Sequence, residues 1–137
     1  MTDCVFCKIV SGQIPASKVY EDSQVLAFMD AGQVNPGHVI VAVKPHVKNI
    51  YDLNADLAAA VFRAATQMAK AVKVSMQPAG MTLLQANEKA GWQTVEHFHI
   101  HVLPRHLGDG VTFTWPVKNP PRAELDRLAD RVKGGLG

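Results

Sequence analysis

The 137-residue sequence has little excess charge, only two cysteines and no long hydrophobic run. Its 14 basic and 12 acidic residues give a formal net charge of +2 without a basic cluster, which argues against a nucleic-acid polymer as partner. No apolar stretch approaches the roughly 20 residues that cross a bilayer, and no secretory-signal pattern opens the sequence. We therefore expect a cytoplasmic protein that has no membrane partner.

Two common phosphate-binding loops are also missing. Neither G-x-x-x-x-G-K-[ST] nor G-x-G-x-x-G occurs, so a bound nucleotide would have to be held by other groups. With 47% hydrophobic residues, a chain of this length can bury roughly two-thirds of the surface that it exposes when unfolded. A single domain over residues 1–137 is therefore expected.

The hydrophobic pattern predicts several short strands. Ranges 18–21 and 24–30 are expected to form a hairpin, and further strands are expected at 37–43, 81–86 and 95–103, the last stopped by Pro104. Clusters of glycine, proline and asparagine separate these ranges, as turns require.

Two helices are predicted after the first strands. A long one begins after the cap residue Asn54 and ends before Gln77, because apolar residues repeat at helical spacing between them. A short one follows the prolines at 120–121 and should turn Leu125, Leu128 and Val132 inward. One main helix among hairpin-spaced strands predicts an α+β fold with an antiparallel sheet rather than a doubly wound parallel sheet.

Three of the six histidines lie at alternate positions, His97, His99 and His101. In a strand, alternate side chains share one face, so the three imidazoles would converge while the apolar residues between them point into the core. Imidazole can attack as a nucleophile, transfer a proton or bind a metal. From these residues alone, nucleophilic catalysis and hydrolysis by a histidine-bound zinc both remain open.

The surrounding sequence resembles the histidine triad (HIT) family, whose signature His-φ-His-φ-His-φ-φ, with φ apolar, is complete at 97–103. The upstream Asn-Pro-Gly-His at 35–38 and the Gln-Thr at 93–94 fall in the expected order. The resemblance covers a core of about residues 4–105 and fades over 106–137. It implies a HIT-like fold, a homodimer, and a hydrolase that cleaves at the α-phosphate of a nucleoside phosphoramidate, an aminoacyl adenylate or a dinucleoside polyphosphate.

The resemblance also implies roles for individual residues. His99 would attack phosphorus and form a covalent nucleotidyl-histidine, His101 would hydrogen-bond a phosphate oxygen, and His38 would orient the site. A purine nucleotide such as an adenosine monophosphate conjugate would be bound by His99 and His101 together with six further residues: Phe28, Asp30, Ala31, Asn87, Gln93 and Thr94. Among these, Asp30 would accept hydrogen bonds from the ribose hydroxyls, and Gln93 and Thr94 would contact the phosphate or the leaving group.

Two tryptophans and one histidine stand outside this pattern. Trp92 occupies the position before Gln93 where many relatives have glycine, which changes the backbone available to the phosphate. Trp115 is expected to be buried in the core of its own domain, and His106 is expected to be exposed and receives no role.

Cys4 and Cys7 form a C-x-x-C pair with only three residues before it, too few for the strand that precedes a redox motif. The resemblance implies instead a structural zinc ion, held by Cys4, Cys7, His46 and His97 in the manner of bacterial members of the family. Two ordinary reduced thiols are the alternative. On the zinc interpretation, His97 braces the strand and leaves His99 and His101 for phosphate.

Two other functions compete with the nucleotide hydrolase. One is a purine nucleotide sensor that binds without turnover, and the other is a histidine-ligated metallohydrolase. The nucleophile His99 argues against a sensor, because binding alone does not require it.

Overall fold

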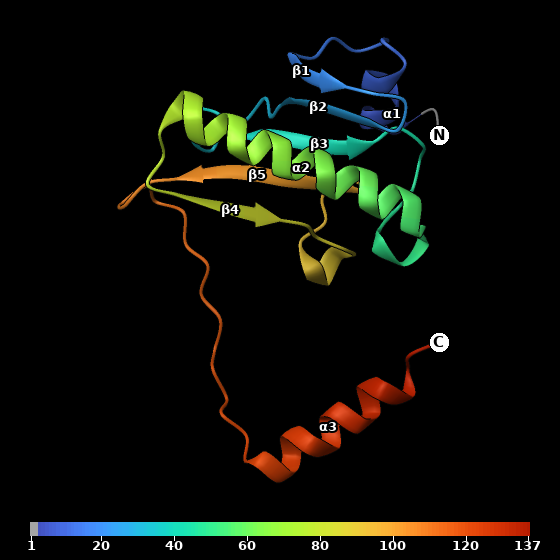
Figure 1. Cartoon of the computed structure of the whole chain (residues 1–137), viewed down its shortest axis with the longest axis vertical. Helices are drawn as coiled ribbons and strands as arrows, with labels where there is room; N and C mark the ends of the chain where they lie inside the picture. Colours follow the sequence, from blue (N-terminus) through green and yellow to red (C-terminus); the bar gives the residue numbers. More distant parts are fainter. Residues whose placement is uncertain (1–2) are drawn as a thin grey trace.

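A five-stranded antiparallel sheet in the order β1-β2-β3-β5-β4 forms the centre of the protein (Figure 1), in a computed structural model that describes residues 3–137. The strands are β1 (Lys18–Glu21), β2 (Val25–Met29), β3 (Val39–Val43), β4 (Gly80–Leu84) and β5 (His99–Arg105). The helices are α1 (Val5–Val10), α2 (Ala55–Met76) and α3 (Arg122–Gly134), with two 3-10 turns, η1 (Ile50–Asp52) and η2 (Lys89–Gly91). The predicted α+β fold and antiparallel sheet are confirmed.

The long helix α2 covers one face of the sheet, packing against β2, β3 and β5 (Figure 1). The Asn54 side chain caps it by accepting a hydrogen bond from the Leu57 amide at 2.9 Å, and Gln77 ends it in the left-handed conformation. Its buried stripe, which includes Val61, Ala65 and Met68, joins Phe98 and the inward residues of the strands in the main core. The predicted helix boundaries are therefore confirmed.

The opposite face of the sheet is covered in part by the short helix α1. Phe6 and Ile9 of α1 pack against Leu26, Phe28 and Ile40 of the sheet in a second, smaller core. Burial on both faces explains why the middle strands are apolar throughout instead of alternating. Side chains that project on the α1 side lie between the helix and the sheet, and the histidine run belongs to that side.

Strand β5 begins later and ends later than the sequence predicts. It starts at His99, so His97 lies just before the strand, and it continues through Pro104 to Arg105. The N and O atoms of one residue in an antiparallel strand point to the same neighbouring strand. The Pro104 oxygen points toward Asn35, which precedes β3 and donates its side-chain amide to it. The pairing of β5 with β3 stops at Val102, so no ladder hydrogen bond needs an N–H from residue 104, and proline is tolerated there.

Helix α3 forms as predicted, but its predicted packing is wrong. Leu125, Leu128 and Val132 are 41%, 39% and 71% exposed because residues 106–121 run away from the sheet as an extended arm and carry α3 with them (Figure 1). Trp115 on this arm is 78% exposed, so its predicted burial is also wrong. Periodicity identified an apolar face, but it does not say which surface covers that face. Among residues 3–137, no helix is long and apolar enough to cross a membrane.

Candidate active site

Two thiols and two imidazoles meet where α1 approaches the start of β5. Cys4 Sγ lies 3.3 Å from His97 Nδ1, and Cys7 Sγ lies 3.3 Å from His46 Nδ1. All four ligand atoms lie within 4.8 Å of one another. Cys4 is the N-cap of α1, so one turn of helix brings both sulfurs to the same point. We call these four residues the thiol-imidazole cluster, and their donor set fits tetrahedral zinc.

His97 is fully buried and is oriented by a backbone carbonyl. Its Nε2 lies 2.6 Å from the Val43 oxygen, which can only accept, so Nε2 carries the proton and Nδ1 faces the sulfurs with a free lone pair. Burial lowers the pKa of His97, the largest of several effects on it, and so favours the neutral ring that a metal requires. The residues thus fit a zinc ion in orientation as well as in type.

His99 receives the opposite orientation from its own backbone contact. Its Nδ1 lies 2.7 Å from the His97 oxygen, so the proton is on Nδ1 and the lone pair is on Nε2. The ring is buried edge-on against Phe6, with 4.9 Å between ring centroids. Burial also lowers the pKa of His99, as the dominant effect, which keeps the ring neutral. A neutral imidazole with a free Nε2 has the electron pair that a nucleophile needs.

His38 and His101 form a chain of hydrogen bonds that we call the histidine relay. The Val34 amide donates to His38 Nδ1 at 3.4 Å, so the proton of His38 is on Nε2, which lies 2.8 Å from His101 Nδ1. His101 Nδ1 therefore accepts, and the proton of His101 is on Nε2, its remaining donor. Asp30 Oδ2 lies near both rings, 3.5 Å from His38 Nε2.

Burial is also the main influence on the protonation of the relay. It lowers the pKa of His101, with help from His99 and His38, to about 4, and it lowers the pKa of His38 in the same direction. The nearby Asp30 carboxylate opposes both shifts without cancelling them. At neutral pH the relay therefore presents a neutral N–H donor rather than an imidazolium.

A cavity of about 690 Å³ opens between α1 and the sheet, and it collects most of the predicted nucleotide-binding residues. Six of them line it: Phe28, Asp30, Ala31, Thr94, His99 and His101. His38 lies behind His101 and reaches the cavity only through the relay. Apolar side chains of α1, among them Val5, Phe6 and Ile9, complete the wall. Sequence reasoning missed these α1 residues, although their helical spacing around the cysteines was a usable signal.

Asn87 and Gln93 do not line this cavity. The Gln93 amide donates to the Lys48 and Val95 oxygens and accepts from the Glu88 amide, so it braces the loop after β4. Asn87 Oδ1 accepts a hydrogen bond from the amide of Ile50.

Three other residues singled out in the sequence also lie away from this cavity. The neighbouring Trp92 is 62% exposed in a left-handed backbone conformation and lines no part of the cavity. His106 is exposed, as expected. His46 is part of the thiol-imidazole cluster.

The family model described as the HIT domain matches residues 11–108. This chain belongs to the HIT family. It is 45% identical over 115 residues to "Protein hit" of Bacillus subtilis, covering 82% of this chain and 79% of the relative. It is 30% identical over 134 residues to the adenosine 5'-monophosphoramidase hnt1 of Schizosaccharomyces pombe, covering 97% of this chain and 98% of the relative.

Solved structures agree with this assignment. The crystal structure of a HIT family protein from Bacillus anthracis has a TM-score of 0.94 at 37% identity and covers 98% of both chains. The crystal structure described as a Zn-bound histidine triad family protein from Mycobacterium smegmatis has a TM-score of 0.76 at 31% identity and covers 98% of this chain and 99% of that chain. The resemblance in the sequence, including the bacterial type with an N-terminal C-x-x-C, is thereby confirmed.

Proposed function

We propose that this HIT protein hydrolyses a nucleoside monophosphate conjugate at its α-phosphate through a covalent nucleotidyl-histidine on His99. The observation that carries the proposal is the hydrogen bond from His99 Nδ1 to the His97 oxygen, which leaves a neutral, unprotonated Nε2 beside the cavity. Relatives named as adenosine 5'-monophosphoramidases support the reaction class, with phosphoramidates, aminoacyl adenylates and dinucleoside polyphosphates as the substrate classes.

The reaction has two displacements at phosphorus. In the first, the Nε2 lone pair of His99 forms an N–P bond while the bond from phosphorus to the leaving group breaks, and the leaving group takes up a proton from solvent as it departs. In the second, a water oxygen attacks the same phosphorus and releases a proton to solvent, and the electron pair of the N–P bond returns to His99. Covalent catalysis of this kind divides one difficult hydrolysis into two easier steps.

The relay would stabilise charge on the phosphate during both steps. With its proton on Nε2, His101 can donate to a non-bridging phosphate oxygen, and because the ring is neutral this donor is available at physiological pH. His38 holds His101 in this form. Thr94 lines the cavity and can contact the phosphate or the leaving group, whereas Gln93 is occupied by its loop contacts.

The nucleoside would lie along β2 in the same cavity. Asp30 Oδ2 lies 3.5 Å from His38 Nε2 and keeps acceptor capacity for ribose hydroxyls, whereas Oδ1 already accepts from the Gly32 amide at 2.7 Å. Phe28 and Ala31 give an apolar wall for a purine base. Asn87 is engaged with Ile50 outside the cavity, so the proposal assigns it to loop bracing.

We also propose that the thiol-imidazole cluster holds a structural zinc ion. When bound, zinc would cross-link α1 to the segment before β5, and four protein ligands leave it no open position for activating water. This role favours the nucleotidyl-histidine route over a histidine-ligated metallohydrolase. The orientation of His97 toward the two sulfurs supports the assignment.

The decisive experiment is rapid quench with adenosine 5'-monophosphoramidate labelled in its phosphate. We expect label to appear transiently on the wild-type protein and to be absent from His99→Ala, with His106→Ala behaving as wild type. Full turnover by His99→Ala would contradict the proposal. Tight binding of adenosine monophosphate with no turnover of any of the three substrate classes would favour the nucleotide sensor instead.

Finally, we propose that two copies form a homodimer through the arm. The apolar face of α3 is exposed in one copy, and β4 is an edge strand that pairs only with β5. An apolar helix face that is exposed and held away from its own domain fits a reciprocal contact with a second copy.

Light scattering on the full chain tests this assembly. Leu125→Asp combined with Leu128→Asp should convert dimer to monomer, while Arg127→Asp changes the charge of α3 by the same amount on its polar side and should remain dimeric. A monomeric wild-type protein, or a dimer that is unaffected by the leucine substitutions, would refute the role of α3.

A further inference from the structure

We propose that Asn35 and Asp109 are positioning residues that fix on which nitrogen His38 and His101 carry their protons. They act through a set of four residues, Asn35, Pro104, Arg105 and Asp109, which we call the turn clamp. The proposal rests on the proposed function for its kinetic consequence, but its main observable is the protonation pattern of the relay. That pattern exists in the free protein, whatever the substrate.

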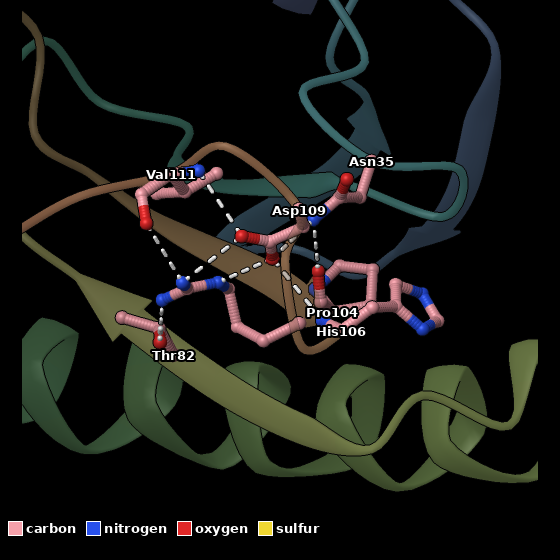
Figure 2. A network of polar contacts seen from close by, with 7 residues as sticks. Asn35, Thr82, Pro104, His106, Asp109 and Val111 are labelled. Carbon is pink, nitrogen blue, oxygen red and sulfur yellow. Dashed lines mark hydrogen bonds and ion pairs between the residues drawn. The ribbon is translucent and has the colours of Figure 1, made fainter.

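The turn clamp ties the turn before β3 to the end of β5 and to the loop that follows it (Figure 2). Asn35 Nδ2 donates to the Pro104 oxygen at 2.8 Å and to Asp109 Oδ2 at 3.0 Å. Arg105 donates two hydrogen bonds to the same carboxylate, with Nε 2.8 Å from Oδ2 and Nη2 3.2 Å from Oδ1. Both hydrogens of the Asn35 amide are thus used across a separation of about 70 residues in sequence, in a residue only 8% exposed.

Asp109 is fixed more strongly than an ordinary loop aspartate. Besides Asn35 and Arg105, the backbone amides of His106 and Val111 donate to its carboxylate, each at 3.1 Å, as Figure 2 shows. These donors, Arg105 foremost, hold the pKa of Asp109 far below its usual range, so it stays ionised. Its side chain is only 5% exposed, where charge-assisted hydrogen bonds are strong.

The turn that the clamp holds is the one that orients His38. The Asn35 oxygen accepts from the His38 amide at 3.1 Å, which closes the turn, and the Val34 amide donates to His38 Nδ1 at 3.4 Å. From the inner side, Gln33 Nε2 donates to the Asp30 and His38 oxygens, both at 2.7 Å. The backbone around His38 is therefore held from both sides. Gln33 holds it from within the connection between β2 and β3, and Asn35 holds it through its hydrogen bond to Pro104 of β5.

The contact from Val34 to His38 is the step that sets the relay. An amide can only donate, so while it faces His38 Nδ1 the proton of His38 must be on Nε2, and His101 Nδ1 must accept it. If the turn moves and this contact is lost, His38 can carry its proton on Nδ1 instead. The relay then reverses, His101 carries its proton on Nδ1, and its Nε2 presents a lone pair to the phosphate.

A clamp that served only to stabilise the fold would have a different consequence. Its loss would lower the melting temperature and leave the protonation pattern of the folded protein unchanged. Asn54→Ala provides the matched control, because it removes a capping asparagine from α2 and touches neither the clamp nor the relay.

The test is nitrogen-15 NMR of histidine-labelled full-length protein, in which protonated and bare imidazole nitrogens have well-separated shifts. For Asn35→Ala and Asp109→Asn we expect the His38 and His101 patterns to move toward protonated Nδ1. With adenosine 5'-monophosphoramidate, we expect kcat to fall about tenfold to hundredfold and KM to change less. Asn54→Ala should lower the melting temperature without either effect.

Wild-type patterns in both folded clamp variants would overturn the proposal, as would a wild-type His101 with its proton on Nδ1. If Asn35→Ala does not fold, Asp109→Asn alone decides, since it keeps the shape of the side chain. A protein that shows the shifts but hydrolyses none of the three substrate classes would refute the proposed function and leave the clamp established.

Discussion

The thiol-imidazole cluster and the cavity site hold histidine rings in opposite orientations, although His97 and His99 are only two residues apart. His97 bonds a backbone oxygen through Nε2 and turns Nδ1 to the cysteines. His99 bonds a backbone oxygen through Nδ1 and leaves Nε2 free beside the cavity. The carbonyl group that each ring meets therefore decides which ring nitrogen keeps a lone pair, and this orientation underlies the metal-ligand role proposed for His97 and the nucleophile role proposed for His99.

The two sites also share one structural element. The backbone oxygen that orients His99 belongs to His97, so a residue of the thiol-imidazole cluster accepts the hydrogen bond that orients the proposed nucleophile. Burial lowers the pKa of both rings and keeps a lone pair available on each. We therefore expect that a change at His99 leaves the cluster intact, whereas a change at His97 also disturbs the orientation of His99 in the cavity.

Replacing His99 should have the largest effect on activity and none on metal content. For His99→Ala we expect turnover of adenosine 5'-monophosphoramidate to fall on the order of 10³-fold or more, as loss of a nucleophile generally causes. Zinc measured by plasma mass spectrometry should stay at the wild-type level, because all four side chains of the thiol-imidazole cluster are unchanged. Reduced zinc in this variant would contradict the separation of the two sites.

Replacing His97 should break both sites together. His97→Ala should lose bound zinc and lower the melting temperature by more than about 10 °C, since a structural metal contributes folding free energy directly. Activity should fall as well, because the segment that orients His99 is no longer held. Cys7→Ala is the companion variant, which removes a ligand without touching β5. A His97→Ala protein with full zinc would sink the metal assignment.

Replacing His101 should weaken catalysis while leaving the cluster intact. His101→Ala removes the Nε2–H donor, and the expected loss in kcat is about 10² to 10³-fold, typical of one lost donor to a developing anion. Zinc content should be unchanged. If kcat stayed the same and only KM rose, His101 would serve binding alone, and the relay would have no part in the chemical step.

The sequence was informative where chemistry depends on spacing and uninformative where it depends on a distant backbone atom. Alternation in a strand predicted that His97, His99 and His101 would share a face, and the structure places His99 and His101 in β5 with His97 just before it. The metal-ligand set came from the family resemblance, and the helix that carries Cys7 was not predicted. No local pattern could reveal that Val34 donates to His38, or that Asn35 reaches Pro104 from across the sheet.

Two overturned or shifted expectations have the same origin. Gln93 stands at the position that the family order predicts, but its side-chain amide is engaged in hydrogen bonds within its own region of the fold. One of these is to the Lys48 oxygen, so it depends on where residue 48 lies in space. The apolar periodicity of α3 correctly predicted a helix, whereas no surface of the described residues covers its apolar face. In both cases the sequence specifies the side chain, and the tertiary contacts decide which group it meets.

The smallest expected effect concerns how stability depends on pH. Folding lowers the pKa of His101 from its ordinary value of 6.5 to about 4, so between these values the unfolded chain binds more protons than the folded one. The contribution of this residue to the free energy of unfolding is therefore complete above pH 6.5 and is lost as pH falls toward 4. For His101→Gln, the free energy of unfolding, measured by urea unfolding followed by circular dichroism, should decline less steeply over that pH window. Any loss of the proposed zinc in acid would steepen both curves alike, so the difference between the two proteins isolates the relay. Leu57→Ala, a core truncation, should only displace the curve. Parallel curves for wild type and His101→Gln would mean that burial does not hold the relay neutral, and the distinction between a neutral donor and a charged one at the cavity would fail.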